Sequence, residues 1–393
     1  MMEDHQMLPE YFKNNGYNTF AVGKIYHRGV TDYPDKRDQF WTEYAPTFWD
    51  SDEMEKHIKE NGYGYRGYKF YPFPKKGGRL LQYYKNNEDL KQLDLEEELK
   101  HSLTGGPVEG DEIPKNGMYD KQVADWAIDK INEQHDDPFF LAVGFLRPHV
   151  PYTAPKKYFD MYNPKELELP DVPEDEMKDI PLIAKAIAHG DWTPRGGWYD
   201  VQQIPGYWRE LVHAYLACVT FADHHVGRVI DALKESGKWD NTIIVLWSDH
   251  GQHLSKKRHF RKQALWQEAT KVPMYFRVPG IKNEGKKSGQ VVSLLDIYPT
   301  LTDLCGLPKP EKVEGKSLVP LLKNPENTWE KPVLNTWYYK NHAVITNDWR
   351  YIRYRDGSEE LYNHVNDPGE HQNLANDPQY THVIEELKKW LPE

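Results

Sequence analysis

The residues that follow an apolar run near position 245 carry the clearest chemical signal in the chain. Ile243 to Leu246 predict a buried strand, and Asp249 and His250 come just after it. In open α/β sheets, ligands bind beyond the carboxyl ends of the strands. A carboxylate and an imidazole together suit a divalent cation. The sequence therefore indicates a metal site here, with an anionic ester as the substrate.

A strongly basic segment at 253–262 comes next in the chain. Its seven basic residues are His253, Lys256, Lys257, Arg258, His259, Arg261 and Lys262. Asp-His-Gly alone is often only a turn, because Asp and Gly favour turns. So many cations in ten residues favour an anion site over a simple hairpin, since they could hold a dianionic group against the metal.

Two more predicted strand ends carry residues of the same kinds. Lys24 and His27 follow a short strand at 19–22, and His149 follows an apolar strand at 138–144. A single His at a strand end is usually a hydrogen-bonded structural residue. Three such ends at one sheet edge are what a catalytic cleft requires. There, lysines would neutralise an oxyanion and imidazoles would donate to the leaving oxygen.

The elements that must position these residues predict an α/β fold, a mostly parallel sheet sandwiched by helices. Helices are expected at 119–135, 207–235 and 293–301, and a further strand at 272–278. Short strands within 333–339, 343–346, 349–354 and 360–362, then a helix at 380–391, predict a small antiparallel subdomain. We expect domains at 1–311 and 312–393, with loop insertions at about 30–116 and 153–205 and a charged helix near 88–101.

Composition narrows the functional classes. The 393 residues carry a formal net charge of -11, which argues against general nucleic-acid binding. Two cysteines exclude a disulfide scaffold, and Cys218 and Cys305 are expected to be free thiols. No apolar run has the length of a membrane span, and the acidic start at Met1 is no signal peptide. Aromatic residues make up 13%, which suits carbohydrate surfaces as well as ordinary packing.

Several segments, in order along the chain, resemble type I sulfatases of the alkaline-phosphatase superfamily, and the iduronate-2-sulfatase-like branch most closely. They are Gly23-Lys-Ile-Tyr-His27, Pro138-Phe-Phe-Leu-Ala-Val-Gly-Phe-Leu-Arg-Pro-His149-Val-Pro, Ser248-Asp-His-Gly251, Val272-Pro-Met-Tyr-Phe-Arg-Val-Pro-Gly280 and Leu294-Leu-Asp-Ile-Tyr-Pro-Thr-Leu. The resemblance covers residues 8–375, and the ordered series is far more specific than any one motif.

The resemblance implies hydrolysis of a sulfate ester through a covalent sulfated intermediate. It implies that Asp249 and His250 are ligands of an active-site calcium ion, and that Lys24 and Lys262 bind the sulfate. His27 would act on the catalytic formylglycine, and His149 would contact the sulfate and the leaving oxygen. The expected partner is a sulfated carbohydrate, as in glycosaminoglycan degradation, and relatives are usually periplasmic, secreted or lysosomal.

One departure from the family pattern concerns the nucleophile. Relatives carry a pair of Asp calcium ligands and a Cys-x-Pro-Ser-Arg segment, whose Cys becomes formylglycine, before the Gly-Lys-x-x-His motif. This chain contains no such segment, and neither Cys218 nor Cys305 stands in one. We therefore expect an N-terminally truncated and inactive chain with an incomplete calcium shell.

Two other functions stay open at this point. One is a non-catalytic sulfatase-like protein that binds a sulfated glycan through its aromatic loops. The other is a phosphoester or phosphonate hydrolase of the same superfamily, a group that uses a Ser or Thr nucleophile and two zinc ions. The lysine pair argues against that second alternative, because it occupies the place of a second metal shell.

Overall fold

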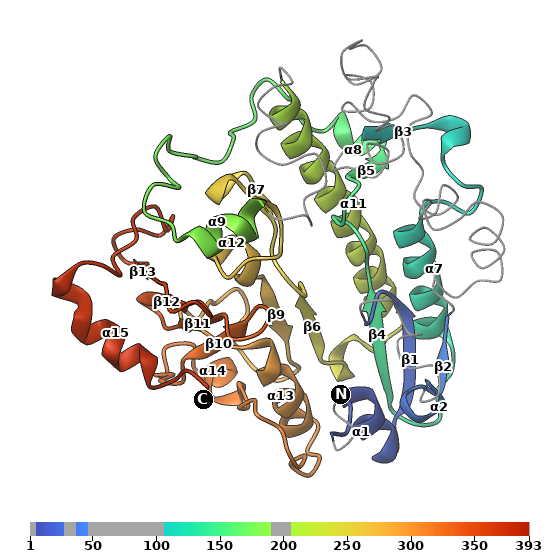
Figure 1. Ribbon diagram of the computed structural model, residues 1–393. Helices are drawn as coiled ribbons and strands as arrows, with labels where there is room; N and C mark the ends of the chain where they lie inside the picture. Colours follow the sequence, from blue (N-terminus) through green and yellow to red (C-terminus); the bar gives the residue numbers. More distant parts are fainter. Residues whose placement is uncertain (1–4, 27–36, 46–105, 190–205, 393) are drawn as a thin grey trace. The chain divides into compact units, whose positions relative to one another are not determined.

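The computed structural model describes residues 5–26, 37–45, 106–189 and 206–392. The chain divides into two compact units, Met1–Leu169 with Pro194–Asn241 and Pro170–Thr193 with Thr242–Glu393 (Figure 1). The domain boundary expected after residue 311 falls inside the second unit. The charged helix expected near 88–101 and the candidate residue His27 lie outside the described residues.

The first unit is built around three parallel strands in the order β2-β1-β4. Strand β1 (Asn18–Gly23) pairs along its whole length with β4 (Phe139–Gly144), and β2 (Glu43–Tyr44) adds to its other edge. The apolar runs that predicted two buried strands therefore form a parallel pair, as expected for an α/β sheet.

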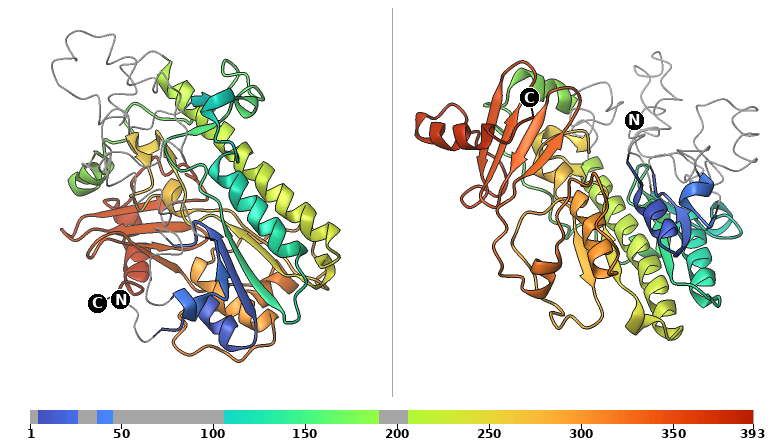
Figure 2. Two further views of the ribbon diagram at one scale, coloured as in Figure 1. Left: turned by 90° about the vertical axis from the view of Figure 1, so that its right-hand side faces the viewer. Right: turned by 90° about the horizontal axis from the view of Figure 1, so that it is seen from below.

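Helices cover both faces of this sheet. Helix α7 (Tyr119–Asn132) packs against the face that carries Val22 and Leu141, whereas α2 (Arg37–Phe40) supplies Phe40 to the opposite face, beside Ala21. Helix α1 (Leu8–Asn14) precedes β1, and α11 (Tyr207–Glu235) runs beside α7 (Figure 2). The sandwiched parallel sheet predicted from the sequence is confirmed.

The described part of the segment expected as a loop at 153–205, residues 153–189, is less irregular than the sequence suggested. It contains strand β5 (Thr153–Pro155), which pairs in parallel with β3 (Gly106–Val108), and the helices α8 (Lys156–Phe159) and α9 (Leu182–His189). Prolines and charged residues between these short elements hide the helical pattern in the sequence. Helix α9 belongs to the second unit.

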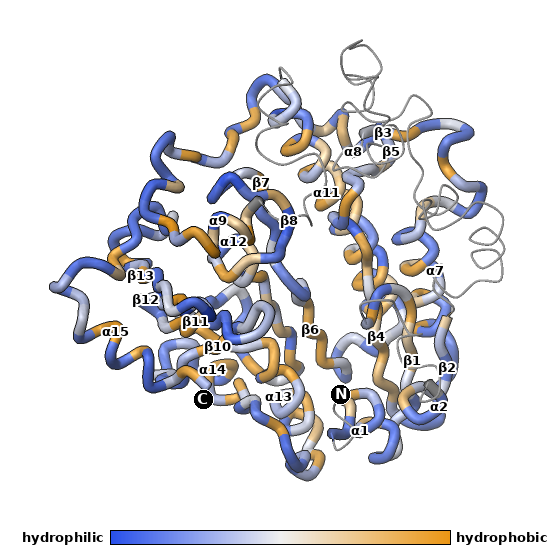
Figure 3. Tube along the Cα trace, viewed as in Figure 1, coloured by the Kyte–Doolittle hydropathy of each residue, from blue (hydrophilic) through white to orange (hydrophobic). Residues whose placement is uncertain are grey.

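After helix α9, the second unit continues with β6 (Ile244–Trp247), the strand that precedes Asp249. It pairs antiparallel with β9 (Met274–Arg277), and α12 (Gln267–Thr270) lies between the two in sequence. Helix α13 (Ile297–Leu304) follows a short 3-10 turn, and α14 (Val319–Lys323) comes next. Figure 3 shows that β4 and β6 are apolar along much of their length.

A four-stranded antiparallel sheet closes the second unit, as predicted. Its strands are β10 (Val333–Thr336), β11 (His342–Ile345), β12 (Trp349–Arg353) and β13 (Glu359–Asn363), and helix α15 (Thr381–Lys388) follows. The strand expected within 333–339 ends at Thr336, because the aromatic residues after it form a turn. Among the described residues, no helix is both long and apolar enough to cross a membrane.

Candidate active site

Lys24 and the loop that bears His149 leave the same edge of the parallel sheet. The last residue of β1, Gly23, is paired with the last residue of β4, Gly144. The Lys24 amide donates to the Gly144 carbonyl at 2.8 Å, and His149 follows five residues later. The structure thus brings together two of the three predicted strand ends, at the edge where ligands bind in such sheets.

This junction has room only for glycine. A Cβ atom at Gly144 would lie 2.1 Å from the Lys24 carbonyl oxygen, and one at Gly23 would lie 2.0 Å from the Gly144 oxygen. Gly23 also has a φ of 86°, which side-chain-bearing residues rarely adopt. The close approach of the two backbones therefore fixes where Lys24 leaves the sheet.

A buried carboxylate holds the start of the loop after β4. Asp120, in the first turn of α7, accepts hydrogen bonds from the amides of Leu146 at 2.8 Å and Arg147 at 3.0 Å. Burial raises the pKa of Asp120, while the Leu146 amide and the nearby Arg147 charge oppose that rise. Sequence reasoning missed Asp120, because an acidic residue at a helix start is ordinarily explained by the helix dipole alone.

Arg147 stabilises the next part of this loop, which bears His149. Its guanidinium donates to the carbonyl oxygens of His149 at 2.7 Å and Pro151 at 2.9 Å, and its side chain is buried. The His149 ring Nδ1 lies 2.7 Å from the Val150 carbonyl oxygen. That contact restrains the orientation of the imidazole ring.

Asp249 and His250 form a close donor pair in the second unit. Asp249 Oδ2 and His250 Nε2 are 3.7 Å apart, and His250 Nδ1 lies 2.8 Å from the Gly251 carbonyl oxygen. A backbone contact at one ring nitrogen is the usual way to present the other nitrogen to a metal. A Cβ atom at Gly251 would lie 2.0 Å from the Glu268 carbonyl oxygen, so the turn needs glycine there.

These two donors fit part of a divalent-cation shell. A carboxylate oxygen and an imidazole nitrogen this close can bind one ion, although calcium takes six to eight ligands. Across the described segments of the chain, no group of three or more His, Cys, Asp or Glu residues is placed to hold a metal. The pair therefore accounts for two ligand positions and no more.

The basic segment after His250 proves to be a hairpin, contrary to the expectation that it is too basic for one. Strand β7 (His253–Leu254) pairs antiparallel with β8 (Phe260–Arg261). Figure 3 shows this hairpin as hydrophilic. Yet three of its basic residues, His253, Lys257 and His259, are buried. These three basic residues therefore support the structure of the hairpin and are not exposed to bind an anion.

Contacts with other segments of the chain hold Lys257 and its neighbours Lys256 and Arg258. The Lys257 ammonium donates to the Glu370 carbonyl oxygen and lies 4.9 Å from the centroid of the Tyr362 ring. The Lys257 amide donates to Glu176 at 2.8 Å. Arg258 donates to the Glu174 carbonyl oxygen at 2.6 Å, and Lys256 forms an ion pair with Glu268 at 2.9 Å.

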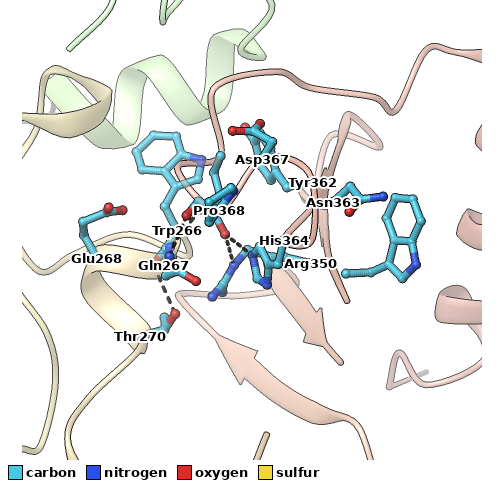
Figure 4. A network of polar contacts seen from close by, with 12 residues as sticks. Trp266, Gln267, Glu268, Thr270, Arg350, Tyr362, Asn363, His364, Asp367 and Pro368 are labelled. Carbon is cyan, nitrogen blue, oxygen red and sulfur yellow. Dashed lines mark hydrogen bonds and ion pairs between the residues drawn. The ribbon is translucent and has the colours of Figure 1, made fainter. Parts of the chain in front are cut away.

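Glu370 is the centre of this network. Its buried carboxylate accepts from Arg350 at 2.5 Å, from His364 at 2.8 Å and from the Gln267 amide at 2.9 Å. Figure 4 shows the side chains of Arg350 and His364 lying next to each other in this network. Although burial alone would raise it, these donors hold the pKa of Glu370 at about 2. The C-terminal sheet is thereby bonded to the start of α12, just after the hairpin.

The hairpin backbone is strained. Ser255, Lys257, Arg258 and Arg261 all have positive φ, at 130°, 56°, 48° and 84°. Such conformations are uncommon for residues with side chains and concentrate at functional sites. Lys262, the predicted sulfate ligand, is half-buried directly after β8. The network around Glu370 therefore holds a strained hairpin whose last strand leads into Lys262.

Neither cysteine has the properties of a catalytic nucleophile. Cys218 is fully buried in α11, and burial raises its pKa to about 12. A thiol acts as a nucleophile only as the thiolate, so Cys218 is inert at neutral pH. Cys305 is the C-cap of α13 and a free thiol, which confirms that the two residues form no disulfide.

Comparison with known proteins identifies the family. The sulfatase family model matches residues 1–307, and the model for the C-terminal part of N-sulphoglucosamine sulphohydrolase matches residues 255–393. A sulfatase of Formosa agariphila is 38% identical over all of this chain and 70% of its own length. Human iduronate 2-sulfatase is 27% identical over 78% of this chain and 55% of its own length.

The solved structure of a phosphonate monoester hydrolase from Silicibacter pomeroyi has a TM-score of 0.73 and 22% identity. The match covers 98% of this chain and 79% of the hydrolase chain. At that identity it shows the shared fold alone. The chain belongs to the sulfatase family, and by that membership it is a sulfuric ester hydrolase of the alkaline-phosphatase-like fold. The family is one that binds a metal ion.

Proposed function

We propose that the protein hydrolyses sulfate esters on a glycan, and that the sulfated unit is a uronic acid or a hexosamine. The observation that carries the proposal is the placement of two pairs of polar residues, Lys24 with His149 and Asp249 with His250, within a chain of the sulfatase family. The match to human iduronate 2-sulfatase supports the choice of sugar.

In this proposal each predicted residue acts on the sulfate group. Lys24 and Lys262 bind its oxygens and stabilise the charge that develops as the sulfur–oxygen bond breaks. In its imidazolium form, with Nδ1–H bonded to the Val150 carbonyl oxygen, His149 donates the proton on Nε2 to the leaving sugar oxygen. His27, outside the described residues, contributes an imidazole near the nucleophile.

Asp249 and His250 would hold two positions around a calcium ion. The ion would supply positive charge against the sulfate oxygens when bound. Formylglycine, which serves as the nucleophile in full-length relatives, would come from neither cysteine of this chain, because neither stands in a Cys-x-Pro-Ser-Arg segment. The substitution Asp249→Asn should lower the affinity for calcium in a titration of the purified protein, whereas Asp171→Asn, at an exposed loop position, should not.

Hydrolysis of 4-nitrophenyl sulfate against 4-nitrophenyl phosphate tests the proposal, with the protein purified as its organism produces it. We expect turnover of the sulfate, loss of activity with a calcium chelator, and roughly 100-fold lower kcat/KM for Lys24→Ala and Lys262→Ala. The exposed controls Lys115→Ala and Lys287→Ala should match the unmodified protein. Preference for the phosphate, or glycan binding with no turnover of either ester, would contradict the proposal.

A further inference from the structure

The turn between β10 and β11 concentrates exposed aromatic residues. It runs Trp337-Tyr-Tyr-Lys-Asn341 and joins two neighbouring strands of the C-terminal sheet (Figure 1). Tyr338 is 55% exposed and Tyr339 is 72% exposed. Tyrosines usually bury most of their ring and leave only the hydroxyl in water, so two adjacent exposed rings need an explanation.

The turn is firmly built. Asn341 is buried, and its side chain donates to the Trp337 carbonyl oxygen at 2.9 Å while accepting from the Arg355 amide at 3.0 Å. The Trp337 amide donates to the Asn341 carbonyl oxygen at 3.0 Å. Trp337 also packs against the core cluster that contains Trp266. The exposed rings therefore stand on a fixed base, which lowers the entropy lost when they bind a ligand.

Backbone strain is the second observation. Tyr338 and Lys340 have φ of 58° and 56°, in the left-handed region that bulky residues rarely adopt. Glycine or asparagine would fill these positions at lower cost. A strained turn that keeps Tyr and Lys is typical of a site where the side chains themselves are needed.

The Tyr339 ring lies beside a cationic group. The Lys340 ammonium is 5.6 Å from the centroid of the Tyr339 ring, and the Trp337 and Tyr338 rings meet edge to face at 4.6 Å. Arg355, whose amide is bonded to Asn341, is exposed on the neighbouring turn. The chain as a whole has a formal net charge of -11, so exposed cations next to aromatic rings differ from the overall negative charge of the protein.

We infer that this aromatic turn is an accessory binding site for an acidic, sulfated carbohydrate chain. Flat aromatic rings suit the apolar faces of pyranose sugars, and Lys340 and Arg355 suit their sulfate or carboxylate groups. A partner protein fits less well, because a stable protein interface needs about 800 Å² on each side and this turn offers two exposed rings. The inference deepens the proposed function and rests on it for the identity of the ligand.

Affinity electrophoresis of the full chain in gels containing heparin, dermatan sulfate or carrageenan tests this inference, with chemically desulfated forms in parallel. Tyr339→Ala should weaken binding to the best sulfated polymer roughly 2- to 10-fold and should also weaken binding to its desulfated form. Lys340→Ala should weaken only the sulfated form, by about 2- to 5-fold. Trp390→Ala is the matched control, because Trp390 is 52% exposed elsewhere in the unit.

Unchanged affinity in Tyr339→Ala, equal losses in Trp390→Ala, or no binding of the unmodified chain to any of the three polymers would each overturn the inference. Turnover of 4-nitrophenyl sulfate, measured alongside in the natural protein, separates this result from the proposed function. The turn variants should leave that small-substrate activity unchanged, since a single aryl sulfate does not span an accessory site. The affinity ratios decide the inference even if no ester is hydrolysed.

Discussion

The strand ends of the first unit and the β7–β8 hairpin of the second hold their candidate residues in different ways. In the first unit, Lys24 and the His149 loop are placed by backbone contacts and by the glycine pair Gly23 and Gly144. In the second, the hairpin before Lys262 is held by buried long-range hydrogen bonds, from the Lys257 ammonium to the Glu370 carbonyl oxygen and from the Lys257 amide to the Glu176 carboxylate.

This difference shows two routes to a fixed site residue. Backbone pairing in a parallel sheet is local in space and needs only small residues at the crossing point. A strained hairpin needs contacts with other segments of the chain. A network around a buried carboxylate gives strong contacts, because removing one partner leaves the others buried without a hydrogen-bond or ion-pair partner. The two units should therefore respond differently to the same kinds of change.

The largest effect is expected at Glu370. The change Glu370→Ala would leave Arg350 buried without its carboxylate partner and remove the acceptor of the Gln267 amide. We expect a loss of about 3–5 kcal/mol in the free energy of unfolding, measured by denaturant titration. Glu385→Ala, an exposed helical glutamate, should change it little. Equal effects in the two variants would show that the network does not hold the hairpin.

The next largest effect on stability is expected on lowering the pH, through one buried histidine in each unit. Burial lowers the pKa of His253 to about 4, and burial with the Arg228 charge lowers that of His225 to about 4. Both rings are neutral when folded but take up a proton near pH 6.5 when unfolded. Stability is therefore lost as pH falls from about 6.5 to about 4, by up to about 3 kcal/mol for His253.

Thermal unfolding between pH 7 and pH 4 measures this effect, and His253→Gln should flatten the dependence for the second unit. Glu370 adds a second loss of stability as the pH falls. Its pKa is about 2 when folded and near 4.5 when unfolded, so its contribution disappears as pH falls below about 4.5. A flat profile from pH 7 to pH 4 would contradict the buried, neutral state of His253.

A smaller effect is expected at the glycine crossing of the first unit. Gly144→Ala would force its new methyl group against the Lys24 backbone, at a cost of about 1–3 kcal/mol. Gly227→Ala is the matched control, because that helical glycine has no atom within 4 Å of a new Cβ. The control should be neutral or slightly stabilising. Both are measured by thermal unfolding, and an equal response would remove the steric argument for Lys24.

Much of this fold was predictable because apolar periodicity determines strands and helices locally. The runs at 138–144 and 207–235 became β4 and α11 almost to the residue. Lys24, His149, Asp249 and His250 could be proposed as site residues because they stand next to such strands. How close these four residues lie to one another in space stays a prediction.

What the sequence could not predict depends on distant partners. Nothing near Lys257 shows that its ammonium bonds to a residue 113 positions later, so the hairpin looked like an anion site. The residues Trp337 to Tyr339 have high strand propensity. They nevertheless form a turn, which the hydrogen bond of the buried Asn341 and the positive φ of Tyr338 define. Tertiary contacts overrode local preference in both cases.

A crystal structure of the protein with sulfate and calcium bound tests the central claim most directly. We expect one sulfate ion within about 2.7–3.2 Å of the ammonium groups of Lys24 and Lys262 and of His149 Nε2, with calcium on Asp249 and His250. A sulfate bound by Lys24 and His149 while Lys262 contacts a different anion, or calcium bound away from Asp249, would contradict the account.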